Sequence, residues 1–235
     1  TRLTINFQGK RLAYLESIKV GMKMDFNEKI SSLHLDVLKE IGNIGAAHAA
    51  TALSDLLQKK IDMRVPNVKT ASFNEMMELA GGSENVVVGI FLRIEGDAEG
   101  SMFFILPVEQ ANRFIRRLIR DESFDFNKPP HSELGLSAMQ EMGNILSGSY
   151  LSALSDFTGL KIYPTVPGLS IDMFGAIISI GLIELSQVSD TVIVINTSIY
   201  EEFISDDEAV KGHFFLLPDP DSFEAIFKAL GVPTT

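Results

Sequence analysis

The chain of 235 residues contains no cysteine, which excludes a thiol nucleophile, a disulfide and a thiolate metal site. Histidine is scarce, and its four copies stand far apart, without metal-ligand spacing. They are His34, His48, His131 and His213. Basic residues are also few, with 20 Lys and Arg against 31 Asp and Glu, for a net charge of −11. This acidic balance argues against nucleic acid and anionic membranes as partners.

Long hydrophobic runs are missing as well. The longest, Met173–Leu185, is interrupted by glycines and by Glu184 and is too short to cross a bilayer. With no secretory signal in view, we expect a cytoplasmic protein. Apolar residues make up 46% of the chain, which is enough to bury a core. We expect one domain over residues 25–235, and we interpret residues 1–24, whose charged side chains are mostly basic, as an extension or remnant outside it.

One stretch of the sequence occurs twice. The segment that begins at Leu35 recurs without a gap from Leu136, an offset of 101 residues. The shared residues include a Glu, a Gly-Asn-Ile triplet, the run Ala-Leu-Ser-Asp and a Val-Pro pair. Two later segments, from Gly100 and Gly212, also resemble each other. The sequence therefore predicts two repeats that share one core and are related by a pseudo-two-fold axis.

Each repeat, about 32–121 and 132–235, begins with a long helix, since apolar residues recur at helical spacing. Each ends with a shorter helix, near Glu109–Arg120 or Ser222–Leu230. Short β-branched or aromatic runs predict six strands, at Lys60–Pro66, Val86–Arg93, Ser101–Leu106, Lys161–Thr165, Val192–Ser198 and His213–Leu217. Short connections between strands favour antiparallel pairing. We therefore expect an α+β fold, with a mostly antiparallel sheet covered by the two long helices.

Both long helices carry the same polar row. In the first row, Asp36, Glu40 and Asn43 stand at i, i+4 and i+7, which places them on one helix face. The second row consists of Ser137, Glu141 and Asn144. A solvated helix face is the alternative, although it does not require the same residues twice. Gly42 and Gly143 precede the two Asn residues, and a glycine inside a helix costs about 1 kcal/mol relative to alanine. This cost indicates either close approach of a ligand or tight packing of the helix on the sheet.

The two rows, each followed by a proline, resemble the signature of the CheC/CheX/FliY phosphatase family. That signature is Asp or Ser, three residues, Glu, two residues, Asn and, later, Pro. Both copies match it in full, and the prolines are Pro66 and Pro167. Two complete sites, and a chain that ends soon after its second closing helix, make the resemblance nearest to the CheC-type members. It implies a phosphatase that hydrolyses the aspartyl phosphate of the response regulator CheY.

The resemblance also implies a role for each position of a row. The predicted catalytic residues are Glu40, Asn43, Glu141 and Asn144. A carboxamide can bind the attacking water without repelling phosphate, and a nearby carboxylate can anchor a lysine of the regulator. Asp36 and Ser137 are expected to contact the regulator or to hold the helix start, and the prolines to be structural. The regulator brings its own Mg²⁺, so no cofactor or metal of the chain itself is expected.

Two further functions remain open. A non-catalytic module of the flagellar switch would bind phosphorylated CheY without hydrolysing it. The resemblance also implies an adaptor role for the receptor deamidase CheD. We expect the chain to be a monomer. In the second repeat Asp172 stands beside Met173 and Phe174, and an apolar patch with one flanking charge is common at recognition surfaces. We interpret these three residues as a CheD-binding surface; the alternative is a core helix packed on the sheet.

Overall fold

The structure is a computed structural model that describes residues 30–185, 191–201 and 209–232. The predicted extension at residues 1–24 lies outside these ranges. The first repeat contains α3 (Ser32–Leu57), β1 (Ile61–Ser72), α4 (Phe73–Leu79), β2 (Val86–Gly96), β3 (Gly100–Pro107) and α5 (Val108–Ile119). The second contains α6 (Glu133–Thr158), β4 (Ile162–Pro164), β5 (Gly168–Met173), α7 (Phe174–Leu185), β6 (Thr191–Glu201), β7 (Val210–Pro218) and α8 (Pro220–Ala229). Both repeats thus follow one element order, except that the single strand β1 corresponds to two strands, β4 and β5.

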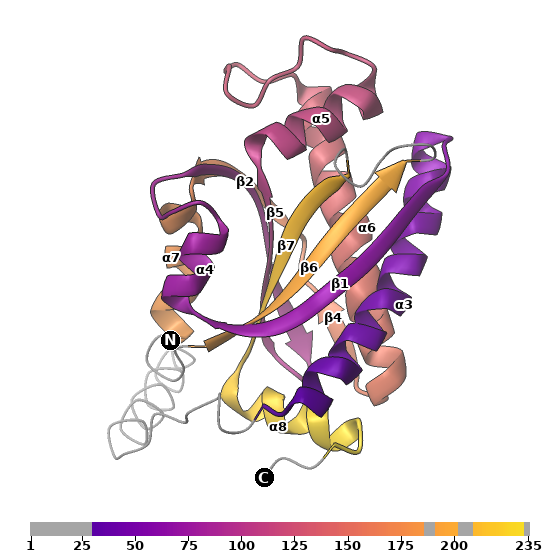
Figure 1. The fold of residues 1–235 in the computed structure, drawn as a ribbon, viewed down its shortest axis with the longest axis vertical. Coiled ribbons are helices and arrows are strands. Elements are labelled where there is room, and N and C mark those ends of the chain that lie inside the picture. Colours follow the sequence, from indigo (N-terminus) through magenta and orange to yellow (C-terminus); the bar gives the residue numbers. More distant parts are fainter. Residues whose placement is uncertain (1–29, 186–190, 202–208, 233–235) are drawn as a thin grey trace, which may run out of the picture.

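The strands form one sheet in the order β1-β6-β7-β3-β2-β4, with β5 also paired to β2 (Figure 1). Every pairing among the described strands is antiparallel, which confirms the predicted α+β fold. Strand β1 of the first repeat pairs with β6 of the second, and β5 of the second pairs with β2 of the first. The repeats therefore exchange strands, and neither completes the sheet alone. The similar segments from Gly100 and Gly212 lie in the adjacent central strands β3 and β7.

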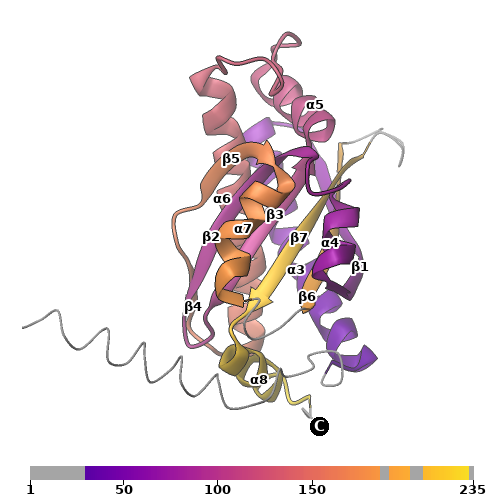
Figure 2. The same ribbon diagram turned by 90° about the vertical axis from the view of Figure 1, so that its left-hand side faces the viewer.

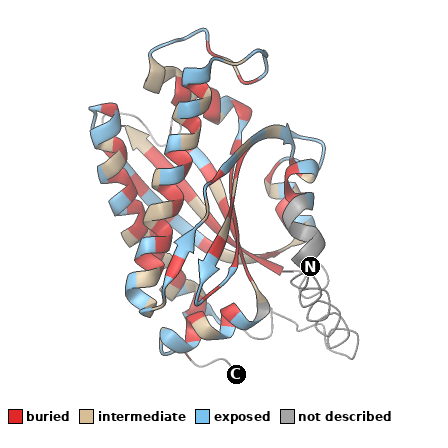
Figure 3. Cartoon of the chain, turned by 180° about the vertical axis from the view of Figure 1, so that it is seen from behind, coloured by how far each residue is buried: buried red, intermediate tan, exposed pale blue. Residues whose placement is uncertain are grey.

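The sheet is covered on both faces (Figures 1 and 2). Helices α3 and α6 lie against one face and enclose the larger core, as the sequence predicts. The short helices α4 and α7 cover the other face with a smaller core that includes Met76, Phe174 and Ile178. The strands consequently carry buried residues on both sides, and β3 is buried at every position from Ser101 to Leu106. Seen from behind, the strands are largely buried whereas the long helices alternate buried and exposed positions (Figure 3).

Helices α3 and α6 run antiparallel and side by side (Figure 1). They approach closely at Gly45, where an added Cβ would lie 3.0 Å from the Cα of Tyr150 and 3.1 Å from the carbonyl oxygen of Ser149. The Tyr150 ring continues into the core against Phe214, and its hydroxyl lies 3.1 Å from Oγ1 of Thr197. Burial raises the pKa of Tyr150 to about 12, so this residue remains a neutral structural link between helix and sheet.

Strand β1 is longer than predicted. The sequence suggests an end at Pro66, whereas the strand continues to Ser72 and its pairing with β6 shifts register between Arg64 and Asn67. A proline has no N–H to donate to the ladder, and a bulge is one of the few places where a strand tolerates it. The bulge therefore lets the strand pass through Val65 and Pro66 and continue beyond them.

Candidate functional site

The first row lies on the N-terminal half of α3. Asp36 and Glu40 are exposed, and Asn43 is half-buried. The side-chain Oδ1 of Asn43 accepts a hydrogen bond of 3.0 Å from the backbone N–H of Val65, inside the β1 bulge. The first row therefore offers two exposed carboxylates to a partner, while its carboxamide oxygen is already bound to the neighbouring strand.

The second row lies on the N-terminal half of α6 and is more open. Ser137, Glu141 and Asn144 are all exposed. Asn144 donates from Nδ2 to Oε2 of Glu141 at 3.3 Å, within the row itself. Because α3 and α6 are antiparallel, the first row lies towards the α8 end of the molecule and the second towards the α5 end (Figure 1). The structure thus places the six predicted residues in two separate rows rather than in one shared centre.

The loop beside the second row explains why Asn144 is not bound to the sheet. Gln140 donates from Nε2 to the carbonyl oxygen of Pro167 at 3.0 Å, which holds this loop against α6. Val166, which corresponds to Val65, is 86% exposed, so its backbone is turned differently from that of its counterpart. Sequence reasoning treated the two Val-Pro pairs as equivalent and gave no role to Gln140.

The two motif glycines differ in how tightly they are packed. Both are buried, and a Cβ on Gly143 would collide with the side chain of Ile90 on β2. A Cβ on Gly42 would meet Val65 at 3.4 Å and Tyr150 at 3.7 Å, which are ordinary contacts. Of the two explanations offered by the sequence, the structure supports tight helix–sheet packing at Gly143.

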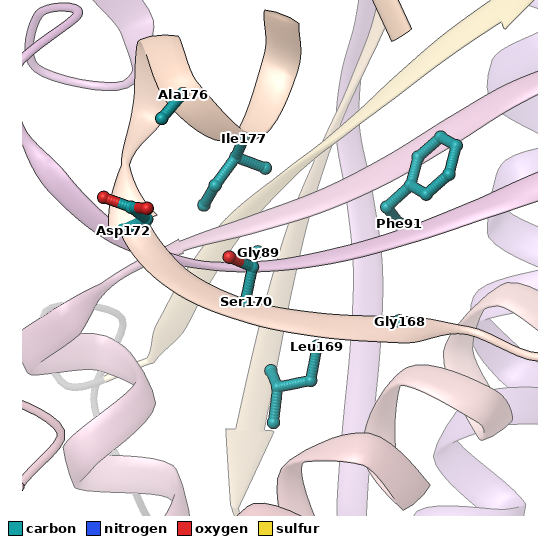
Figure 4. A pocket seen from close by; sticks show the side chains of 8 residues that line it. All are labelled: Gly89, Phe91, Gly168, Leu169, Ser170, Asp172, Ala176 and Ile177. Atoms are coloured by element: carbon teal, nitrogen blue, oxygen red, sulfur yellow. The ribbon is translucent and has the colours of Figure 1, made fainter. Parts of the chain in front are cut away.

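The predicted CheD-binding residues lie where β5 meets α7, on the sheet face opposite the rows. Asp172 is exposed, Met173 is 45% exposed, and a shallow pocket of about 270 Å³ lies beside them (Figure 4). Its walls are Gly89, Phe91, Gly168, Leu169, Ser170, Asp172, Ala176 and Ile177. Phe174 is fully buried against Phe215, so its inclusion in the contact surface is wrong: it belongs to the smaller core.

The described residues also bear on whether the chain has a metal site or a membrane span. Within the described ranges, no group of three or more His, Asp or Glu side chains is placed to hold a metal ion. None of the helices in those ranges is long and apolar enough to span a membrane. The groups that the rows offer are therefore carboxylates, carboxamides and a hydroxyl on helix faces.

Comparison with known proteins identifies this arrangement. A family model described as the CheC-like family matches residues 33–70 and 134–171, which include both rows and both Val-Pro pairs. The chain is 52% identical over 202 residues to the CheY-P phosphatase CheC of Bacillus subtilis (strain 168), a match that covers 86% of this chain and 96% of that protein. It is 30% identical to the flagellar motor switch phosphatase FliY of the same organism, over 57% of this chain and 35% of FliY.

A solved structure shows the same fold. The crystal structure of Thermotoga maritima FliY aligns with a TM-score of 0.64 at 21% identity, and the alignment covers 86% of this chain and 98% of that one. The fold and the duplicated rows define a two-repeat protein of the chemotaxis phosphatase type. The identity to the Bacillus subtilis protein over nearly its whole length makes the assignment specific: the chain belongs to the CheC-like family.

Proposed function

We propose that this chain is a phosphatase that hydrolyses the aspartyl phosphate of CheY. The observation that carries the proposal is the pair of Glu–Asn rows at identical spacing, in a chain that matches a CheY-P phosphatase over nearly all of that protein's length. The cytoplasmic location expected from the sequence accompanies the proposal as a prediction.

The proposed reaction needs a water molecule placed in line with the phosphorus–oxygen bond to the regulator's aspartate. The carboxamide oxygen of Asn43 or Asn144 would accept a hydrogen bond from that water and orient it. The water oxygen forms a bond to phosphorus and the bond to the aspartate oxygen breaks, which yields a free carboxylate and inorganic phosphate. The regulator's bound Mg²⁺ supplies charge neutralisation, and Glu40 or Glu141 would hold a lysine of the regulator by a charge-assisted hydrogen bond.

Of the two rows, the second is better arranged to bind the attacking water. Asn144 is exposed, and within the described residues its amide nitrogen bonds to Glu141 of the same row, so its oxygen can accept a hydrogen bond from water. Asn43 has one lone pair of Oδ1 engaged by Val65 and is half-buried. A carboxamide oxygen has two lone pairs, so the first row keeps a reduced capacity. We therefore assign most of the turnover to the second row.

The decisive experiment is release of inorganic phosphate from phosphorylated CheY by wild type and by the double variant Asn43→Ala/Asn144→Ala. We expect the double variant to lose about 100-fold or more in kcat, since an unpositioned water costs at least that much. Asn74→Ala, at an exposed position on α4, is the matched control and should be fully active. Full activity in the double variant would refute the mechanism. Binding without phosphate release by wild type would favour the alternative of a non-catalytic switch module.

The anchoring role of the glutamates has its own test. Glu40→Lys/Glu141→Lys places positive charge opposite the regulator's lysine and should weaken binding to beryllofluoride-activated CheY by more than about tenfold. Glu40→Gln/Glu141→Gln should weaken it less, because a carboxamide still accepts a hydrogen bond. Unchanged affinity in the Lys variant, measured by titration calorimetry, would remove the anchoring role.

We also propose that the exposed part of the β5–α7 corner, around Asp172 and Met173, docks the deamidase CheD. An apolar pocket of about 270 Å³ with a carboxylate at its rim suits an apolar side chain flanked by a basic group. Asp172→Lys should abolish CheD binding in calorimetry and leave phosphate release unchanged. Asp55→Lys, an equal charge change at an exposed α3 position, is the control. Normal CheD affinity of Asp172→Lys would place the docking surface elsewhere.

A further inference from the structure

Exposed apolar side chains recur in register with the two rows. Among the described residues, the large apolar side chains with high exposure include Leu33 at 53% and Leu134 at 63%, which occupy the same position of the two repeats. A second equivalent pair is Leu56 at 43% and Phe157 at 52%. Single exposed apolar residues are normal on a protein surface. Two pairs that follow the repeat suggest instead that each copy keeps apolar side chains in water for a common reason.

Only one of the pairs lies in line with the motif. Leu33 precedes Asp36 by three residues and Glu40 by seven, so at 100° per residue it stands on the same face, within about 20° of Glu40. Leu134 has the same relation to the second row. Leu56 lies about 160° around the helix from Glu40 by the same arithmetic, and Phe157 is placed likewise on α6. Each row is therefore preceded by one exposed leucine. Leu56 and Phe157, which are exposed but lie off the rows, serve as controls.

The helix starts do not need these leucines. A hydrophobic staple would join the residue before the N-cap to the fourth helical position. In α3 the N-cap is Ser31, and the staple positions are Ile30 and Leu35, which both pack against the larger core. Leu33 is the second helical residue and points away from this contact. In α6 the N-cap is Ser132, and Leu136, at the fourth helical position, packs against the larger core. Leu134, at the second helical position, remains exposed.

We propose that Leu33 and Leu134 are apolar anchors that bind the phosphorylated regulator beside each row, an inference that rests on the proposed function. An exposed ion pair contributes little net affinity, whereas one desolvated apolar side chain can dominate a small interface. From the leucine to the Asn of each row is ten residues, or about 15 Å of helix. One partner can therefore contact the leucine at one end of this line and deliver its phosphate to the Asn at the other. The same occupant at both rows accounts for the same leucine in both repeats.

The test compares Leu33→Ser/Leu134→Ser with Leu56→Ser/Phe157→Ser, in phosphate release from phosphorylated CheY and in calorimetry with beryllofluoride-activated CheY. We expect the first variant to raise KM and Kd about tenfold (about 1.4 kcal/mol), a loss that only a minority of interface side chains produce, and to keep kcat. The second variant should retain all three values. Leu33→Met/Leu134→Met should restore binding, because a long apolar side chain is kept. Thermal melting should be the same for every variant, since all four positions are exposed.

The outcomes separate the two proposals. If wild type releases no phosphate, the proposed function fails. If wild type is active while Leu33→Ser/Leu134→Ser keeps a normal KM and Kd, the anchor role is wrong and the function stands. An equal rise of KM in the Leu56→Ser/Phe157→Ser control, or a loss confined to kcat, also overturns the anchor role.

Discussion

The Val-Pro pair that follows each long helix occupies opposite environments in the two repeats. In the first repeat Val65 is 1% exposed and Pro66 is exposed; in the second Val166 is 86% exposed and Pro167 is buried. The first pair forms a bulge in the continuous strand β1, and the second pair separates β4 from β5. As a consequence only the first pair presents a backbone N–H to the Asn of its row.

Side chains outside the motif produce this difference. The hydroxyl of Thr165 accepts from the N–H of Arg93 on β2 at 3.0 Å, and the N–H of Thr165 donates to the carbonyl oxygen of Arg93 at 2.9 Å. A side-chain oxygen thus replaces a backbone carbonyl, and the ladder stops there. Gln140 then holds Pro167 from the helix side. The corresponding residues of the first repeat are Arg64 and Lys39, which have no side-chain acceptor for the first bond and no carboxamide for the second. Motif spacing therefore sets which residues share a helix face, and residues beside the motif decide whether the Asn is free.

The largest expected effect separates the two Asn residues. Asn144→Ala should lower kcat for phosphate release to about a quarter or less, whereas Asn43→Ala should keep more than about half. In the proposed mechanism each Asn acts mainly in the transition state, and among the described residues Asn43 is bound to the sheet whereas Asn144 is bound only within its own row. Single-turnover decay of phosphorylated CheY measures the rate of hydrolysis for each variant. An equal loss in the two variants would show that the Val65 hydrogen bond does not restrain the first row.

The next effect concerns stability and separates the two glycines. Gly143→Ala should destabilise the fold by about 1–3 kcal/mol, since its Cβ would displace Ile90 in the packed core. Gly42→Ala should be neutral or stabilising by up to about 1 kcal/mol, since the site accepts a methyl group and alanine favours helix. Urea unfolding at equilibrium measures both free energies. Equal destabilisation would mean that the first repeat is packed as tightly as the second at this position.

The sequence predicts the parts of this protein that depend on local period. The rows were found because Glu40 and Asn43 recur 101 residues later, and helical spacing alone puts them on one face. Strand β5 was missed because Gly168 follows directly after Pro167 and the pair is typical of a loop. Of the second helical layer, α4 was not predicted, and α7 stood only as the alternative of a core helix packed on the sheet, because the run around Ile178 is apolar without a clear helical period. The state of Asn43 depends on a strand and on neighbours far along the chain, which no single-sequence pattern contains.

The smallest expected effect separates the two helix starts. In α3, Nδ1 of His34 accepts from the N–H of Ser31 at 3.0 Å and lies 2.6 Å from its hydroxyl, while the ring packs edge-on against Phe227 of α8 at 4.4 Å. The equivalent position in α6 is Gly135, whose N–H donates to Oγ of Ser132. At this position of the two helices, therefore, only α3 carries a side chain that can titrate near neutral pH.

Burial lowers the pKa of His34 below 6.5, because a charged ring would lose its hydration in the protein interior. Well above pH 6.5 the ring is neutral in both folded and unfolded chains and contributes no pH dependence. As the pH falls through 6.5, the unfolded chain binds the proton and the folded chain does not, so the free energy of unfolding decreases until the folded pKa is reached.

His34→Gln keeps a side chain that can cap the helix and removes the titration. Urea midpoints between about pH 7.5 and 5.5 should therefore fall less in His34→Gln than in wild type. Burial and nearby Lys69 also lower the pKa of His213, which remains in both proteins, so the difference between their slopes reports on His34. Parallel slopes would show that the start of α3 opens enough to accept the proton without loss of stability.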